Sequence, residues 1–131
     1  MRRDAFLRLG GFDERFVPAW FEDVDLCARL LTLGTILYWP ASCFVHEGGT
    51  AAAALGYDQF LPIYYCNAIR FWRKHHGVWA ALAYRALVCM GMVLRLLAAP
   101  LGARVPASRS QAVIAYSRVL RRAAGLGGLA Q

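Results

Sequence analysis

The longest apolar stretch of the sequence, residues 78–99, is the feature that most restricts how this chain can fold. It is 22 residues long, and its only charged side chains are those of Arg85 and Arg95. A helix of about 20 apolar residues can span the hydrocarbon core of a bilayer. An arginine near the middle of such a helix costs about 2.5–3.5 kcal/mol on insertion scales. We therefore expect a helix that lies in the membrane interface, with its arginines reaching the lipid headgroups.

The charged residues are unevenly distributed along a chain whose formal net charge is +7. All eight acidic residues precede residue 60, and every charged residue from Arg70 onward is basic. A basic half of this kind suits an anionic partner, either a phosphate surface or a membrane leaflet. The basic and aromatic residues at 70–76 would also suit a nucleic acid. Because the apolar stretch follows them directly, we expect a membrane surface as the partner and no nucleic acid.

The four cysteines are far apart and form no Cys-x-x-Cys pair, which argues against a zinc site and against a disulfide framework. We expect them to be reduced thiols in the core; they are Cys27, Cys43, Cys66 and Cys89.

Apolar periodicity and helix-terminating residues predict several helices. The predicted ranges are 4–9, 22–33, a helix opened by Pro62 and ending at Gly77, 78–99, and 111–124. The Gly10-Gly11 pair suits a left-handed helix end. Residues 100–108 are expected to be a linker, and the glycine-rich C-terminal tail is expected to fray.

Two short segments rich in β-forming residues, 35–39 and 42–46, are predicted to be strands. Pro40 separates them, and the second ends at His46 before the glycine pair at 48–49. Helices that alternate with short strands predict an α/β fold.

An acidic cluster at the start of the predicted helix 22–33 is the clearest candidate for chemistry. Glu22, Asp23 and Asp25 crowd its first turn, where acidic residues often serve only to complement the helix dipole. Asp25 and Arg29 are four residues apart and are expected to pair on one helix face. His46, taken alone, suits either a hydrogen-bonded structural role or a metal ligand.

The segment GGFDERFVPAWFEDVDLCARLLTLGTILYWPASCFVHEGGT resembles the second half of the catalytic domain of family 2 glycosyltransferases, in a rhamnosyltransferase-like branch. The match is dense over residues 2–50 and looser over 70–77. It has four parts in order: the glycine pair, Phe-Asp-Glu, Glu-Asp-x-Asp-Leu-x-x-Arg, and a histidine before glycines.

This resemblance implies the C-terminal part of a GT-A domain and a transfer of sugar, with inversion, from a nucleotide-diphosphate sugar to an acceptor hydroxyl. It implies that Asp23 is the general base, since a carboxylate can take the hydroxyl proton. Glu22 would orient the acceptor, and Trp20 would offer an apolar face to a sugar ring or pack in the core. His46 would help to hold a divalent cation, Mg²⁺ or Mn²⁺, on the diphosphate.

The nucleotide-binding half of such enzymes, with its own Asp-x-Asp motif, has no counterpart in this sequence. We therefore expect a fragment that is inactive alone. Its domains would be a catalytic part at 1–56, a basic amphipathic helix at 57–77, an apolar helix at 78–100, and a linker with a basic helix at 101–131. The resemblance implies a glycan or lipid-linked acceptor in cell-surface polysaccharide synthesis, at the cytoplasmic face of a bacterial inner membrane. A non-catalytic membrane-binding module, a small structural membrane protein and the remnant of a truncated gene are the alternatives.

Overall fold

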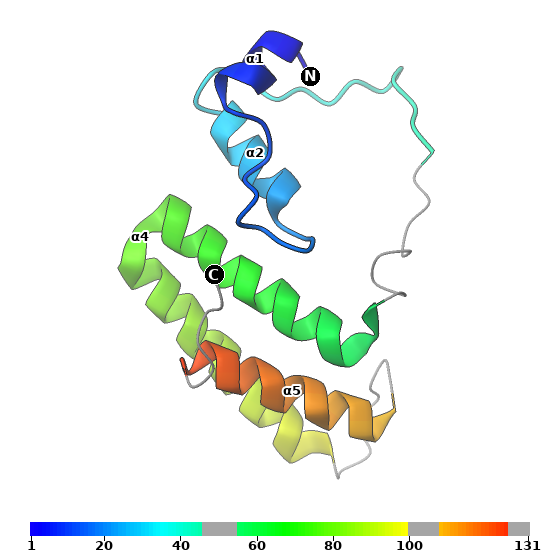
Figure 1. Cartoon of the computed structure of the whole chain (residues 1–131), viewed down its shortest axis with the longest axis vertical. Helices are drawn as coiled ribbons and strands as arrows, with labels where there is room; N and C mark the ends of the chain where they lie inside the picture. Colours follow the sequence, from blue (N-terminus) through cyan, green and yellow to red (C-terminus); the bar gives the residue numbers. More distant parts are fainter. Residues whose placement is uncertain (46–54, 100–107, 126–131) are drawn as a thin grey trace.

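The computed structural model describes residues 1–45, 55–99 and 108–125, and these residues form helices joined by irregular segments (Figure 1). The helices are α1 (Arg3–Arg8), α2 (Glu22–Leu30), α4 (Tyr57–Ala98) and α5 (Arg109–Ala123). His46 and the glycine pair at 48–49 lie outside the described residues. So do most residues of the predicted linker and tail.

The predicted α/β fold, as the C-terminal part of a GT-A domain, is wrong: the described residues contain no strand. The segment 35–45 runs as an irregular chain away from α2 (Figure 1). Its large side chains face solvent, with Tyr38 at 89% and Val45 at 93% exposure. A strand is stabilised by backbone hydrogen bonds to a neighbouring strand and by burial of one face. Neither is available to this segment in the described part of the chain, so its β-forming composition is not sufficient.

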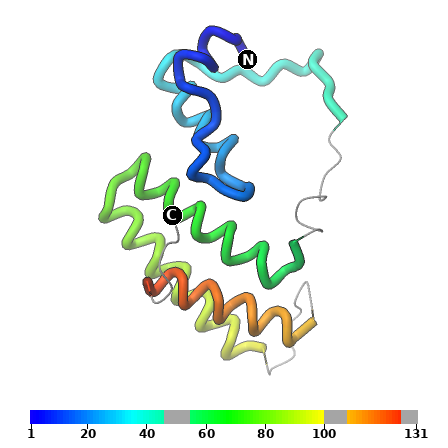
Figure 2. The backbone as a smooth tube through the Cα atoms, in the orientation of Figure 1, coloured from blue at the N-terminus to red at the C-terminus, as the bar shows by residue number. Residues whose placement is uncertain are grey.

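Helix α4 folds back on itself at Gly77, as the tube in Figure 2 shows. Gly77 has φ 85° and ψ 178°, a combination that essentially only glycine adopts. We call residues 57–76 the first arm of α4 and residues 78–98 the second arm. The predicted helix boundary at this glycine is therefore confirmed.

The predicted start of the first arm at Pro62 is wrong, because the helix begins at Tyr57 and contains the proline. Proline has no backbone N–H, so the carbonyl of Asp58 lacks its usual helical donor. Arg118 of α5 supplies a donor instead, through Nη1 at 3.2 Å from that carbonyl oxygen. The same guanidinium pairs with the Asp58 carboxylate at 2.5 Å.

The main apolar core lies between α4 and α5. Ser108 caps α5 by accepting a hydrogen bond from the backbone N–H of Gln111 at 3.3 Å. Small residues on α5 bring it close to the second arm of α4. The buried members of the core are Val88, Met92, Ala112, Ala115, Tyr116 and Val119. The predicted amphipathic helix at 111–124 is thus confirmed, and its apolar side packs on α4.

By length and composition, α4 could cross a membrane, a criterion that core helices of soluble proteins can also meet. Little of its most apolar window is buried within the protein, at 17%. An association of α4 with a membrane is therefore compatible with the fold.

Candidate functional site

Asp25, in the first turns of α2, is completely buried and accepts contacts from three basic side chains. Nε of Arg29 lies 2.8 Å from Oδ2, as the four-residue spacing predicts. Nζ of Lys74 lies 2.5 Å and Nε2 of His75 lies 2.7 Å from Oδ1. Burial alone raises the pKa of Asp25, but the hydrogen bonds from Lys74, His75 and Arg29 outweigh it and hold that pKa below its usual value.

Lys74 connects Asp25 to a second acid, Asp13, of the glycine-rich segment. Its Nζ lies 2.6 Å from Oδ2 of Asp13, which also pairs with Arg15 at 2.7 Å. The guanidinium of Arg15 and the ammonium of Lys74 hold the pKa of Asp13 well below its usual range. The Lys74 ammonium also lies 5.7 Å from the ring centre of the buried Phe16. The first arm of α4 therefore fixes both the glycine-rich segment and α2.

Arg29 also holds the end of α1 and the glycine pair against α2. Its guanidinium donates to the carbonyl oxygen of Leu9 at 2.8 Å and to that of Gly11 at 2.7 Å. Gly10 and Gly11 have φ of +74° and +76°, as predicted for a left-handed helix end. The glycine pair and the Asp25–Arg29 pair of the sequence signature are thus joined in space.

Asn67 of α4 determines the backbone that leads into the acidic cluster. Trp20 and Phe21 both have positive φ, 70° and 76°, which is unfavourable for aromatic residues. The buried Asn67 holds this turn by donating from Nδ2 to the carbonyl oxygens of Ala19 at 2.8 Å and Trp20 at 3.1 Å. Its Oδ1 accepts from Arg70 at 2.6 Å.

The rings of Trp20 and Phe21 pack against aromatic residues of the first arm of α4. Trp20 meets Phe60 edge-on, with ring centres 4.7 Å apart. Phe21 lies 5.2 Å from Tyr64 and 5.7 Å from Phe71 between ring centres. The sequence leaves two roles open for Trp20, an apolar face for a sugar ring or packing in the core. In this structure its ring packs against Phe60.

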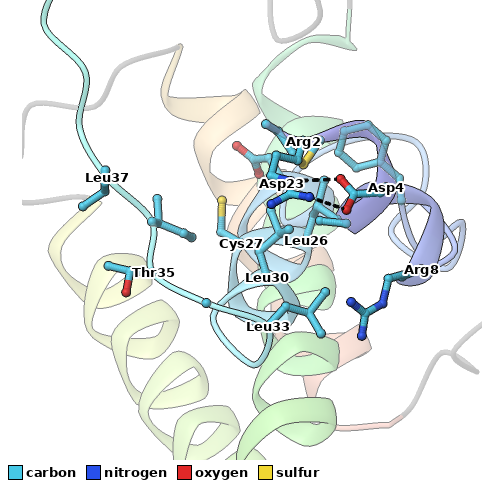
Figure 3. A pocket seen from close by; sticks show the side chains of 15 residues that line it. Arg2, Asp4, Arg8, Asp23, Leu26, Cys27, Leu30, Leu33, Thr35 and Leu37 are labelled. Carbon is cyan, nitrogen blue, oxygen red and sulfur yellow. Dashed lines mark hydrogen bonds and ion pairs between the residues drawn. The ribbon is translucent and has the colours of Figure 1, made fainter.

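Asp23 differs from Asp25 in that it is exposed. Among the described residues, its Oδ1 accepts one local hydrogen bond, from the backbone N–H of Val24 at 2.8 Å. Asp23 lines a cavity of about 690 Å³ and lies beside the Arg2–Asp4 ion pair (Figure 3). The apolar wall of the cavity comes from α2 and the segment that follows it, and includes Leu26, Cys27, Leu30, Leu33, Ile36 and Leu37.

Glu22 is half-buried, and its Oε2 is buried without a hydrogen-bond partner in the described part of the chain. A buried carboxylate oxygen without a donor is unfavourable. This oxygen is therefore suited to accept a hydrogen bond from a bound hydroxyl or water.

Among the described residues, no three acidic, histidine or cysteine side chains form a group that could hold a metal ion. The chain has a single Asp-x-Asp sequence, at Asp23 and Asp25. Both oxygens of Asp25 are already taken by basic side chains, so this pair does not fit a metal. The predicted ligand His46 lies outside the described residues, and the cation stays a prediction.

The sequence did not identify Lys74, His75 and Asn67 as parts of this site. From the sequence, Lys74 and His75 belong to the basic and aromatic stretch 70–76 that we expect to meet a membrane surface, whereas in the structure both contact Asp25. The looser family resemblance over 70–77 is the one sequence signal that could have included Lys74 and His75 in the site. It does not predict that they contact Asp25. The cysteine prediction is also corrected, because Cys27 and Cys43 are exposed rather than in the core, although all four thiols are free.

Searches of protein-family models, of curated proteins and of solved structures found no match to this chain.

Proposed function

We propose that this chain provides the acceptor side of a membrane-associated glycosyltransferase in which Asp23 is the general base. The observation that carries this proposal is the difference between two carboxylates in one helical turn. Asp25 is buried and fully paired, whereas Asp23 is exposed in a cavity that also receives Arg2 and Arg8. A base must reach its substrate, and Asp23 is the acid of the cluster that can.

In this reaction the Asp23 carboxylate takes the proton of an acceptor hydroxyl. The hydroxyl oxygen attacks the anomeric carbon of the donor sugar, and the bond from that carbon to the nucleotide diphosphate breaks. Configuration at the carbon is inverted by this single displacement. Glu22, the neighbour of Asp23 in the signature, would help to orient the acceptor.

The proposal assigns no donor site to these residues. The helical fold lacks, in its described part, the sheet on which the resembled enzymes bind a nucleotide. The nucleotide-sugar donor would be bound by residues beyond this signature, and we expect the 131-residue chain to be inactive by itself. The glycan or lipid-linked acceptor and the cytoplasmic face of a bacterial inner membrane belong to the same proposal.

The test compares the 131-residue chain with the longest in-frame product that contains it. Both are assayed in membranes for transfer from UDP- and dTDP-sugars, together with Asp23→Asn and, as a control, Asp58→Asn at an acid outside the signature. We expect transfer by the longer product only, a loss of about 100-fold or more in Asp23→Asn, and no loss in the control. Full activity in Asp23→Asn would refute the role of this residue.

A non-catalytic membrane-binding module is the second candidate, because the second arm of α4 exposes a broad apolar surface. It predicts no sugar transfer by any product that contains the chain.

A further inference from the structure

The second arm of α4 exposes a continuous apolar surface along its whole length. At about 100° per residue, the exposed apolar side chains from Val78 to Leu97 cover about half of the helix circumference, and the exposed Arg95 lies outside that half. We call this surface the apolar face; its large members are Val78, Trp79, Leu82, Leu87, Met90, Val93, Leu94 and Leu97. Trp79 is 81% exposed, and none of the leucines is less than 44% exposed. A contiguous surface of eight large, exposed apolar side chains marks an interaction site.

The two arginines that argue against a membrane span, Arg85 and Arg95, do not lie on the apolar face. Arg85 points to α5, where its Nε donates to the carbonyl oxygen of Ala123 at the end of that helix. The helical positions of Arg85 and Arg95 both fall outside the half-turn occupied by the apolar face. Burial of this face in lipid therefore leaves Arg95 on the far side of the helix and Arg85 at the edge of the face, where it is bonded to α5.

The opposite side of the second arm is covered by α5, which decides how the arm can meet a bilayer. Helix α5 carries Arg118, Arg121 and Arg122 with exposed side chains. If the second arm crossed the membrane, α5 would enter the hydrocarbon with it, and each arginine would cost about 2.5–3.5 kcal/mol near the centre. A helix parallel to the surface places only the apolar face in lipid.

We propose that the second arm of α4 lies in the plane of an anionic membrane, with the apolar face inserted at the boundary between headgroups and acyl chains. The charges beside the face fit an anionic lipid: Arg73 and His76 are exposed just before Trp79, and the chain has no acidic residue after Asp58. A second copy of the chain is a poorer fit, because its apolar face would bring the same basic residues with it. This inference locates the membrane contact of the proposed function and does not depend on sugar transfer.

The first measurement is flotation of the full chain with vesicles of phosphatidylcholine, alone and mixed with phosphatidylglycerol. We expect stronger binding to the mixed vesicles, and weaker binding as salt is raised. The double variant Leu87→Glu/Leu94→Glu should bind the mixed vesicles at least about tenfold more weakly than the unaltered chain. The control, Phe44→Glu/Val45→Glu, introduces the same two charges at apolar residues outside the face that are more exposed than Leu87 and Leu94, and it should bind as the unaltered chain does.

The second measurement concerns the unaltered chain and so does not depend on the folding of any variant. Oriented circular dichroism should show the helices parallel to the bilayer, and alkaline carbonate should release the chain from vesicles. Retention after carbonate with a helix normal to the bilayer would establish a span and overturn the proposal. Self-association without vesicle binding would overturn it in favour of a second copy, and equal binding to neutral vesicles would refute the anionic preference. Flotation needs no sugar donor, so its failure and failure of the Asp23→Asn test are separate results.

Discussion

Oδ1 of Asp25 lies 2.7 Å from Nε2 of His75, a residue fifty positions further along the chain. The same oxygen meets Lys74 at 2.5 Å, so two consecutive residues of α4 converge on one buried carboxylate. A buried carboxylate is tolerated only where basic partners and hydrogen bonds replace water. This cluster therefore fixes α2 on the first arm of α4 and leaves Asp23, on the same helix, facing the cavity.

Replacement of Asp25 by asparagine tests this cluster. At neutral pH we expect the free energy of unfolding to fall by about 3 kcal/mol, because the basic partners lose the charge they share. Folding lowers the pKa of Asp25 below the usual 3.8, so its contribution is full above that value and is lost as the pH falls through the folded pKa. Urea unfolding across the acid range should show a shallower loss of stability in Asp25→Asn than in the unaltered chain.

Asp23→Asn is the control for the same experiment. Asp23 is exposed, so its replacement should leave neutral stability within about 0.5 kcal/mol of the unaltered chain. Equal destabilisation by the two variants would contradict the distinction between the two acids.

Asn67→Asp tests how the turn before the acidic cluster is held. The substitution keeps the shape of the side chain but removes the Nδ2 donor that serves the carbonyls of Ala19 and Trp20. We expect a loss of about 2–3 kcal/mol, because a buried charge then faces two carbonyl oxygens. Hydrogen exchange should show faster exchange of the amides near Trp20 and Phe21. Unchanged protection there would mean that the aromatic packing alone maintains the turn.

Gly77→Ala and Gly91→Ala form a matched pair within α4. A Cβ at Gly77 meets no atom of the described residues within 4 Å, so we assign the penalty to its φ of +85° and expect about 1–3 kcal/mol. Gly91 is helical, and a Cβ there makes an ordinary contact with Arg95 at 3.7 Å. Alanine at Gly91 should stabilise the chain by about 0.5–1 kcal/mol. Thermal melts of the two variants should therefore shift in opposite directions.

Arg118→Met tests the contact that compensates for Pro62. The variant removes the donor to the Asp58 carbonyl and the partner of its carboxylate. Because the Arg118 side chain is 46% exposed, we expect a modest loss of about 0.5–1 kcal/mol. Exchange at the start of α4 should become faster, whereas Arg121→Met, on the same helix and exposed, should leave it unchanged.

Local spacing in the sequence was sufficient for several features of this protein. The helices around Leu26 and at 111–124, the break at Gly77 and the Asp25–Arg29 pair all follow from contacts within a few residues. Such contacts are set by helical periodicity and glycine conformation, which the sequence displays directly.

Only the tertiary structure decided the features that depend on distant partners. The segment 35–39 has the composition of a strand, but a strand needs a neighbour, and the described residues provide none. Lys74, His75 and Asn67 look like ordinary residues of an amphipathic helix until the fold brings them to Asp25 and to the turn at Trp20. The sequence predicts that 78–99 lies at a membrane surface, but which side of this helix is exposed depends on α5, which packs against the other side of the second arm. The sequence by itself determined which segments are helical, whereas long-range packing determined which of their side chains are buried, paired or exposed.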